Sequence, residues 1–237
     1  MDTQRIVTEI RQHGFSVLSG FSAGETRDIK AFLLTRPVYT DAHVPETARK
    51  AGRHKAWRSA SLSSECVCID LPDAILCPHI FDRGLELTDV AGTYLDCDPP
   101  LAYSMNAFWT RPGPGAIRPD IQEMHVDADD IRFLVMFVYL NDVITEQDGP
   151  QDLEGPDGVT RTIYGPAGTV FLADTSRPHR GRKPISGERG LAWFRWGVSN
   201  PPPAYTWDGN APITANELGS RYPTDSRLRE SIRLIAR

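Results

Sequence analysis

Apolar side chains recur at helical spacing at the start of the chain. Val7 and Ile10 are three positions apart and Ile6 and Ile10 are four apart, which puts all three on one helical face. Gly14 ends this pattern, as glycine often does just after a helix. Residues 15–18 then alternate in polarity and predict a short strand. The chain is therefore expected to begin with a helix followed by a strand.

A second helical pattern follows, and a third appears before residue 100. Ser22 is a candidate N-cap for a helix that runs on to Leu34. The spacing over residues 76–95 again permits a helix, which Asp98-Pro99-Pro100 ends. Between these helices, residues 38–60 are polar, partly basic and without a clear period. We interpret them as a long surface segment that is either a lid over a binding site or a solvated connection.

The second half of the chain changes to short apolar runs separated by glycine and proline. Strands are predicted over residues 102–109, 131–140, 161–164, 168–173 and 190–196. Turns are predicted over residues 148–150 and 155–158. Many short strands with this punctuation are typical of a β-sandwich or a jelly roll.

The length of 237 residues is enough to bury a substantial core as one domain. We expect a single domain over residues 1–237, with mostly helical support and surface segments over 1–100. A β core over residues 101–200 and a C-terminal extension over 201–237 complete it. Within the extension, residues 226–237 predict a basic helix with a solvated face.

Composition and charge exclude several classes of protein. Hydrophobic residues make up 40% and charged residues 24%, an ordinary globular mixture, and the formal net charge is −5. This balance argues against nucleic-acid binding, which needs clustered excess Lys and Arg. The longest apolar run, residues 133–140, is too short to span a membrane, and the first residues lack a signal-peptide pattern. We therefore expect a cytoplasmic protein with a small-molecule partner; the oligomeric state is left open.

The cysteines are expected to be reduced thiols. They are Cys66, Cys68, Cys77 and Cys97, and in a chain of this size without an export signal we favour reduced thiols over a disulfide framework. The spacings Cys66-x-Cys68 and Cys77-x-His79 raise a zinc hypothesis. We favour buried thiols over zinc, because these spacings differ from the usual zinc knuckle.

Candidate metal chemistry comes from His125-Val126-Asp127 together with His179 and Arg189. Residues two apart on a strand face the same side, so His125 and Asp127 can point inward together. Two imidazoles and one carboxylate can occupy one face of an iron(II) ion and leave three positions open. Arg189 offers a planar, permanently charged fork that suits a carboxylate. The combination indicates a non-heme iron oxygenase that uses 2-oxoglutarate; the alternative is a set of histidines with ordinary structural partners.

At the level of motifs, the chain resembles the phytanoyl-CoA hydroxylase-like family of iron(II)/2-oxoglutarate dioxygenases. The similar stretches are His13 to Phe21, Gln122 to Asp127, Leu140 to Val143 with Asp148 to Pro150, and Gly168 to His179. The resemblance spans most of the chain. It implies a mainly β, α+β fold with flanking helices around a double-stranded β-helix, or jelly-roll, core.

The resemblance also assigns roles to individual residues. It implies that His125, Asp127 and His179 are the iron ligands and that Arg189 binds the distal carboxylate of 2-oxoglutarate. Asn106 and Arg111 lie on the strand and turn before the metal motif, where the family supplies further co-substrate contacts. Their alternative roles are an amide on a strand and an arginine on a surface turn.

Two departures from the family pattern are visible. Residues 151–158 are more acidic than the family's stretch and lack its Pro-Gly-Ser-His sequence, which we expect to affect the rim of the site and the choice of substrate. Gly181 stands where members often have serine, and this removes one hydroxyl contact to 2-oxoglutarate. Neither departure touches the metal ligands.

The activity implied by the resemblance is hydroxylation of an unactivated C–H bond in a small metabolite. Iron(II), 2-oxoglutarate and dioxygen would be the cofactor and co-substrates, and succinate and CO2 would be released. The metabolite is expected to be amino-acid-like or a natural-product intermediate. Asp127 favours hydroxylation over halogenation, since similar halogenases have a small residue there. Desaturation, cyclisation and epimerisation remain open, as does a non-catalytic jelly-roll binding protein. A cupin-type enzyme without 2-oxoglutarate is less favoured, because it would need His-x-His.

Two groups of side chains have both a functional and a structural interpretation. Arg177, Arg180, Arg182 and Lys183 surround His179 in sequence and could steer an anionic substrate, although a solvated loop is the favoured interpretation. Three tryptophans could wall a pocket, but alternating large residues in a barrel more often form core; they are Trp109, Trp193 and Trp196.

Overall fold

The computed structural model describes residues 1–39, 53–56, 66–69, 71–113, 119–200 and 213–237. Two antiparallel sheets face each other. The larger has the order β1-β9-β6-β11-β5-β4-β2-β3 and the smaller the order β10-β7-β8. The strands of the larger sheet are β1 (Phe15–Leu18), β2 (Pro37–Tyr39), β3 (Arg53–Ala56), β4 (Cys66–Ile69), β5 (Leu101–Thr110), β6 (Phe133–Tyr139), β9 (Val170–Ala173) and β11 (Arg189–Gly197). The strands of the smaller sheet are β7 (Gln151–Glu154), β8 (Thr160–Ile163) and β10 (His179–Gly181).

The chain alternates between the two sheets, as a jelly roll requires. It leaves β5 in the larger sheet, passes beside β10 and enters β6, where it is back in the larger sheet. It then forms β7 and β8, returns to β9, crosses to β10 and ends in β11. Strand β11 lies between β5 and β6 and pairs antiparallel with both. The predicted fold class, a jelly-roll core with flanking helices, is confirmed.

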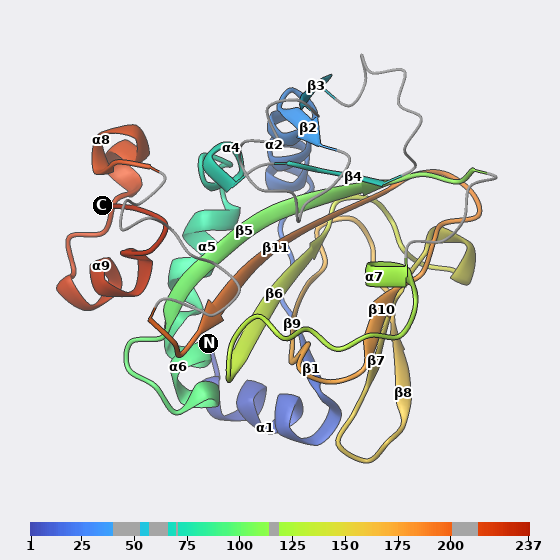
Figure 1. Cartoon of the computed structure of the whole chain (residues 1–237), viewed down its shortest axis with the longest axis horizontal. Helices are drawn as coiled ribbons and strands as arrows, with labels where there is room; N and C mark the ends of the chain where they lie inside the picture. The colour runs from blue at the N-terminus through green and yellow to red at the C-terminus, as the bar shows by residue number, and fades with distance from the viewer. Residues whose placement is uncertain (40–52, 57–65, 70, 114–118, 201–212) are drawn as a thin grey trace.

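Helices cover the outer face of the larger sheet, opposite the smaller sheet (Figure 1). They are α1 (Thr3–His13), α2 (Ala23–Leu34), α4 (Leu71–Ile75), α5 (Ile80–Glu86) and α6 (Thr88–Leu95). The remaining helical elements are α7 (Pro119–Gln122), α8 (Ala215–Leu218), α9 (Ser226–Ile232) and two 3-10 turns, Glu146–Asp148 and Gly219–Arg221. No helix among the described residues has the length and apolar character needed to cross a membrane.

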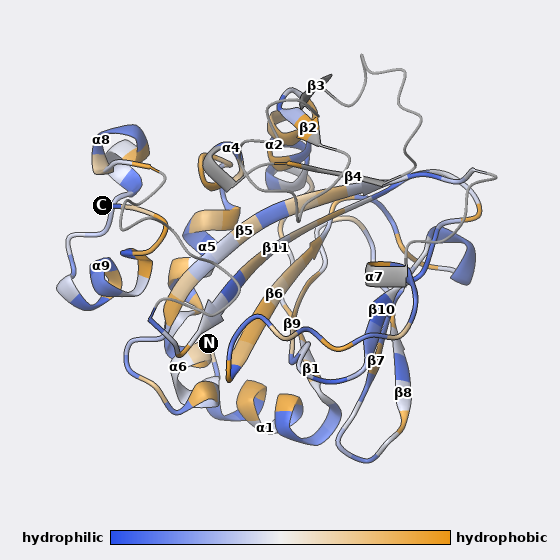
Figure 2. Cartoon of the chain, in the orientation of Figure 1, coloured by the Kyte–Doolittle hydropathy of each residue, from blue (hydrophilic) through white to orange (hydrophobic). Residues whose placement is uncertain are grey.

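Two hydrophobic clusters hold the layers together. One joins the helices to the outer face of the larger sheet, and the other fills the space between the sheets. Strand β6 is buried at every position because it contributes to both clusters, and it is correspondingly apolar along its length (Figure 2). Trp109 and Trp196 belong to the outer cluster and are core residues, whereas Trp193 belongs to the inner one.

The N-terminal expectations are confirmed. Helix α1 ends at Gly14, whose φ of 84° is the left-handed conformation that favours glycine. Helix α2 begins at Ser22, which forms a capping box with Glu25.

The helix expected over 76–95 is instead two helices, α5 and α6, which meet at Leu87. Helix α5 lies close to β11, since a Cβ on Gly84 would approach the Phe194 ring to 2.7 Å.

The C-terminal expectation is wrong in part. Helix α9 ends at Ile232, short of the predicted length, and it is not simply a solvated face. Ile232, Ile235 and Ala236 are fully buried in the outer cluster, and the Ser231 hydroxyl donates to the Pro100 carbonyl. The end of the chain is therefore part of the core. Most of the proposed lid segment, residues 40–52 and 57–60, lies outside the described residues.

Candidate metal centre

Backbone hydrogen bonds bring the three predicted ligands together. The amide of His125 donates to the carbonyl of His179 at 3.0 Å, and that of His179 donates back at 2.9 Å. The Asp127 amide donates to the Thr175 carbonyl at 3.0 Å. His125 thus forms an isolated bridge with β10, rather than part of a regular strand as the sequence suggested. Two segments far apart in sequence are fixed side by side, each with its ligands facing the space between the sheets.

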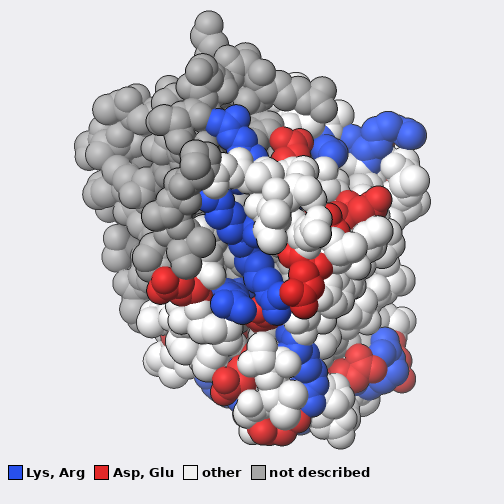
Figure 3. Space-filling view, turned by 90° about the vertical axis from the view of Figure 1, so that its right-hand side faces the viewer, with Lys and Arg blue, Asp and Glu red and all other residues white. Residues whose placement is uncertain are grey.

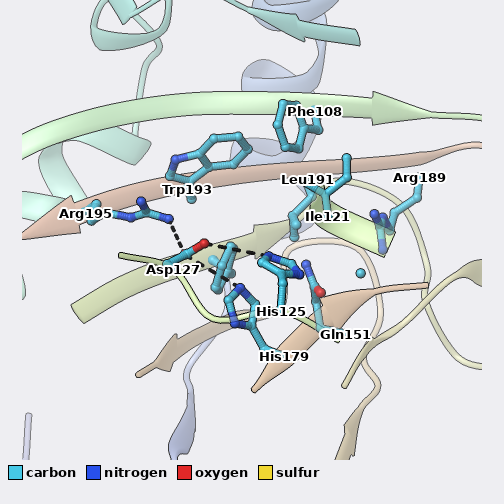
Figure 4. Close-up of a pocket in the computed structure, with 12 residues that line it drawn as sticks. Phe108, Ile121, His125, Asp127, Gln151, His179, Arg189, Leu191, Trp193 and Arg195 are labelled. Atoms are coloured by element: carbon cyan, nitrogen blue, oxygen red, sulfur yellow. Dashed lines mark hydrogen bonds and ion pairs between the residues drawn. The ribbon is translucent and has the colours of Figure 1, made fainter. Parts of the chain in front are cut away.

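The ligand atoms converge on one point (Figure 4). The nearest Asp127 oxygens lie 3.7 Å from Nε2 of His125 and 3.6 Å from Nε2 of His179. One ligand atom from each of the three residues lies within 4.8 Å of the others. Bonds of about 2.1 Å to three ligands on one face of an ion need ligand atoms about 3 Å apart, so only a small contraction closes the set. The donor set fits one divalent metal.

Both imidazoles are oriented for coordination. Nδ1 of His125 lies 2.8 Å from the Glu123 carbonyl oxygen, and Nδ1 of His179 lies 2.9 Å from the Arg177 carbonyl oxygen. A carbonyl can only accept, so each Nδ1 carries the proton and each Nε2 keeps its lone pair toward Asp127. Metal-binding histidines are commonly held in this way by a backbone carbonyl. Two histidines with only structural roles would not need the same tautomer, nor Nε2 atoms that point toward the same carboxylate.

A second arginine, which the sequence analysis missed, holds the carboxylate ligand. Arg195 Nη2 lies 2.8 Å from Asp127 Oδ2, and Nη1 forms an ion pair with Asp129. Asp130 accepts hydrogen bonds from the amides of Val198 at 2.7 Å and Ser199 at 2.9 Å. Asp127, Asp129 and Asp130 thereby tie the metal-binding loop to the end of β11 and the two residues after it. The signal was present in the sequence, because Arg195 shares the alternating face of β11 with Arg189.

Electrostatics favour the protonation states that a metal needs. Burial raises the pKa of Asp127, but Arg195 and the two histidines outweigh this effect and hold it below its ordinary value. Burial lowers the pKa of His179 by more than the neighbouring Asp127 raises it, so the imidazole stays neutral near pH 7. A charged carboxylate and a neutral imidazole are the forms that coordinate a cation.

A pocket extends from the ligands to Arg189. Apolar walls come from Phe108, Ile121, Phe137, Leu191 and Trp193, and the lining also includes Gly181 and the polar side chains of Gln151, Arg189 and Arg195. The side chain of Arg189 is only 2% exposed, and its Nη1 donates to the carbonyls of Gly149 at 2.5 Å and Arg182 at 3.2 Å. Its guanidinium is therefore held rigidly at the opposite end of the pocket from Asp127 and Arg195 (Figure 4).

The other two predicted co-substrate contacts are placed differently. Asn106 pairs with Trp193 across β5 and β11 and so shares its face. Its Oδ1 accepts hydrogen bonds from the amides of Ile69 at 3.0 Å and Ala107 at 2.7 Å, which ties β5 to the end of β4. Arg111 follows β5 and is half-buried. Neither side chain is among those that line the pocket, so a role in binding 2-oxoglutarate stays a prediction for both.

Three of the four basic residues around His179 are engaged in ion pairs. Arg180 Nε lies 2.8 Å and Arg182 Nε 2.7 Å from the same oxygen of Asp152, whose side chain is fully buried. Arg177 pairs with Asp174 at 3.3 Å. On the side of the molecule where β7, β8 and β10 lie, basic side chains accordingly have acidic neighbours (Figure 3). This arrangement favours the structural interpretation of the cluster over substrate steering.

Replacing Asp152 with asparagine is expected to lower the free energy of unfolding at pH 7 by roughly 1–3 kcal/mol. Breaking a buried ion pair costs about 3–5 kcal/mol, and the partial exposure of both arginines reduces this figure. Burial raises the pKa of Asp152, but its arginine and Thr162 hydrogen bonds outweigh this and lower it. The difference between variant and wild type should therefore shrink as pH falls below about 4.

Urea denaturation across this pH range measures that effect. Asp157→Asn is the matched control, because Asp157 also pairs with an arginine of the smaller sheet but is exposed. It should change stability little. Equal losses in the two variants, or a difference that persists at low pH, would show that Asp152 does not act as a buried charged anchor.

The cysteines give no support to the zinc hypothesis where they are described. Cys77 is fully buried, and burial raises the pKa of its thiol well above the ordinary value. Cys97 is a half-buried free thiol. Over the described ranges, the one group of three possible ligands is His125, Asp127 and His179. The side chains of Cys66 and Cys68 lie outside the described part of the chain.

Comparison with known proteins supports the architecture. No family model and no curated protein matches the chain. HygX from Streptomyces hygroscopicus, solved with nickel, 2-oxoglutarate and hygromycin B bound, is similar in structure with a TM-score of 0.55 and 16% identity, covering 83% of this chain and 87% of HygX. SnoK, a non-heme alpha-ketoglutarate-dependent carbocyclase from nogalamycin biosynthesis, is similar with a TM-score of 0.56 and 15% identity. The match covers 81% of this chain and 83% of SnoK. A Pseudomonas putida prolyl-4-hydroxylase is similar with a TM-score of 0.54 and 19% identity, and the match covers 83% of this chain and 99% of the hydroxylase. At these identities the similarity establishes a shared fold.

Proposed function

We propose that this protein is an iron(II)/2-oxoglutarate-dependent dioxygenase that hydroxylates an unactivated C–H bond of a small metabolite and releases succinate and CO2. One observation carries the proposal. Two carbonyl-oriented imidazoles and Asp127 converge at one end of a pocket, and the buried Arg189 lies at the other end. A metal at the first end and an anion at the second are what these groups are suited to bind.

Each residue of the site has a separate proposed role in binding or positioning. His125, Asp127 and His179 would hold iron(II), and Arg189 would bind the distal carboxylate of 2-oxoglutarate. Iron(II), 2-oxoglutarate and dioxygen together would supply the oxidising power for the reaction. Arg195 holds Asp127 in place, and the apolar walls of the pocket exclude water from the reacting groups. The similarity in fold to HygX, which binds nickel and 2-oxoglutarate, supports this assignment.

Cyclisation and epimerisation, which use the same cofactors, are the second candidate reactions. SnoK is a carbocyclase and SnoN, another similar structure, is an epimerase, so this fold supports reactions other than hydroxylation. Asp127 fills the third ligand position, which argues against a halide at that place. Membership of the phytanoyl-CoA hydroxylase-like family is a narrower prediction that rests on the motifs given above.

Formation of succinate from 2-oxoglutarate tests the proposal. Purified protein supplied with iron(II), 2-oxoglutarate, ascorbate and dioxygen should release succinate, and the rate should rise when a panel of small metabolites includes the substrate. Removal of the metal with a chelator should stop the reaction, and added iron(II) should restore it. Well-folded protein that forms no succinate with any candidate would favour a binding protein with a jelly-roll fold.

A further inference from the structure

Strand β7 points a glutamine side chain into the proposed co-substrate pocket. Gln151 pairs with Gly181 of β10, and Leu153 pairs with His179, so these four positions share the face that carries the metal ligand. Gln151 is also among the residues that line the pocket. The acidic stretch of residues 151–158, which we expect to affect the rim of the site, begins with strand β7, and the first residue of this strand lines the pocket.

The Gln151 side chain has an unmet hydrogen-bonding requirement. The residue is 8% exposed, and its Oε1 has no hydrogen-bond partner among the described residues. Buried polar atoms in native proteins are nearly always hydrogen-bonded to protein, water or a ligand, so this amide is available to a polar group that enters the pocket. The strand itself does not depend on this side chain, because the Gln151 backbone amide donates to the Tyr139 hydroxyl at 3.0 Å.

Gly181 leaves the space in which two polar side chains meet. A Cβ at this position would lie 2.8 and 2.9 Å from the Nη2 and Nη1 atoms of Arg189 and 3.0 Å from Oε1 of Gln151. The glutamine amide and the arginine fork therefore approach the same small volume from β7 and β11. Figure 4 shows Gln151 between the histidines and Arg189.

We propose that Gln151 is a co-substrate-binding residue that holds the distal carboxylate of 2-oxoglutarate together with Arg189. The inference rests on the proposed function. Rotation about its terminal bond lets the amide present an N–H to a carboxylate oxygen. A hydrogen bond to a charged group of this kind corresponds to about 10-fold to 100-fold in affinity. Gly181 makes the arrangement possible because a larger side chain would push the two polar groups apart.

Binding measurements on protein loaded with cobalt(II) under nitrogen test the inference. In Gln151→Leu, the Kd for 2-oxoglutarate should rise about 10-fold to 100-fold while the Kd for cobalt(II) stays unchanged. The thermal midpoint should stay the same or rise, because the substitution removes an unsatisfied buried group. Gln151→Met is a second variant of similar shape, which covers the case in which leucine packs poorly.

Pyruvate is the matched probe, since it keeps the keto acid but lacks the distal carboxylate. Wild type and Gln151→Leu should bind pyruvate equally. Unchanged binding of 2-oxoglutarate in both variants, or an equal loss for both ligands, would overturn the inference. Failure of the proposed function would look different: wild-type protein loaded with metal would not bind 2-oxoglutarate at all.

Discussion

Asp127→Ala is expected to weaken iron(II) binding by at least about 100-fold and to abolish coupled turnover. Changes to groups that merely orient a ligand typically cost 10–100-fold in metal affinity, and loss of the ligand itself should cost more. A second effect acts in the same direction. Arg195 would keep its positive charge beside the site after its Asp127 partner is gone, and like charges repel. Calorimetric titration of the apo-protein with iron(II) under nitrogen measures the change.

Val126→Ala is the control for this loop. Val126 lies between the two ligands in sequence, and its side chain points outward with 54% exposure. The substitution should leave both metal affinity and turnover close to wild type. Full activity in Asp127→Ala would contradict the ligand assignment, and equal losses in both variants would indicate damage to the loop rather than loss of a ligand.

Arg189→Met should raise the Kd for 2-oxoglutarate by about 30-fold to several thousand-fold, while metal affinity changes little. Removing one partner of a buried charge pair costs roughly 2–5 kcal/mol. Arg189 is 2% exposed, so water would replace its contacts to the ligand poorly. Methionine keeps much of the length and apolar character of the aliphatic part of the arginine side chain, which limits the loss of packing.

Two further variants separate charge from geometry. Arg189→Lys keeps the charge but loses the planar fork, and we expect an intermediate affinity. Arg132→Met removes an exposed arginine beside β6 and should bind 2-oxoglutarate like wild type. Unaltered affinity in a folded Arg189→Met protein would remove Arg189 from the site.

Elements defined by apolar spacing and standard caps could be predicted from the sequence. Helix α1 with its glycine stop, helix α2 with its Ser22 cap and the apolar strand β6 all have local signals. Strand β7 was missed because its polar residues are buried. Asp152 is compensated by two arginines and Gln151 faces the pocket, so the strand has the polarity of a surface turn.

The metal ligands could be predicted, but the groups that hold them could not. His125, Asp127 and His179 follow a recognisable spacing, whereas the carbonyls that orient the imidazoles belong to Glu123 and Arg177, whose side chains carry no signal for this role. Arg195 could have been found from its alternation with Arg189. Gln151 could not, because its place depends on the pairing of β7 with β10.

The proposed function requires iron(II) and 2-oxoglutarate to bind together in one site. Anaerobic titration of apo-protein with iron(II) and then 2-oxoglutarate, followed by visible absorption, tests this most directly. We predict a weak metal-to-ligand charge-transfer band that appears only when both are present and that weakens in Arg189→Ala. Well-folded protein that shows no such band at saturating concentrations would contradict the proposed cofactor pair.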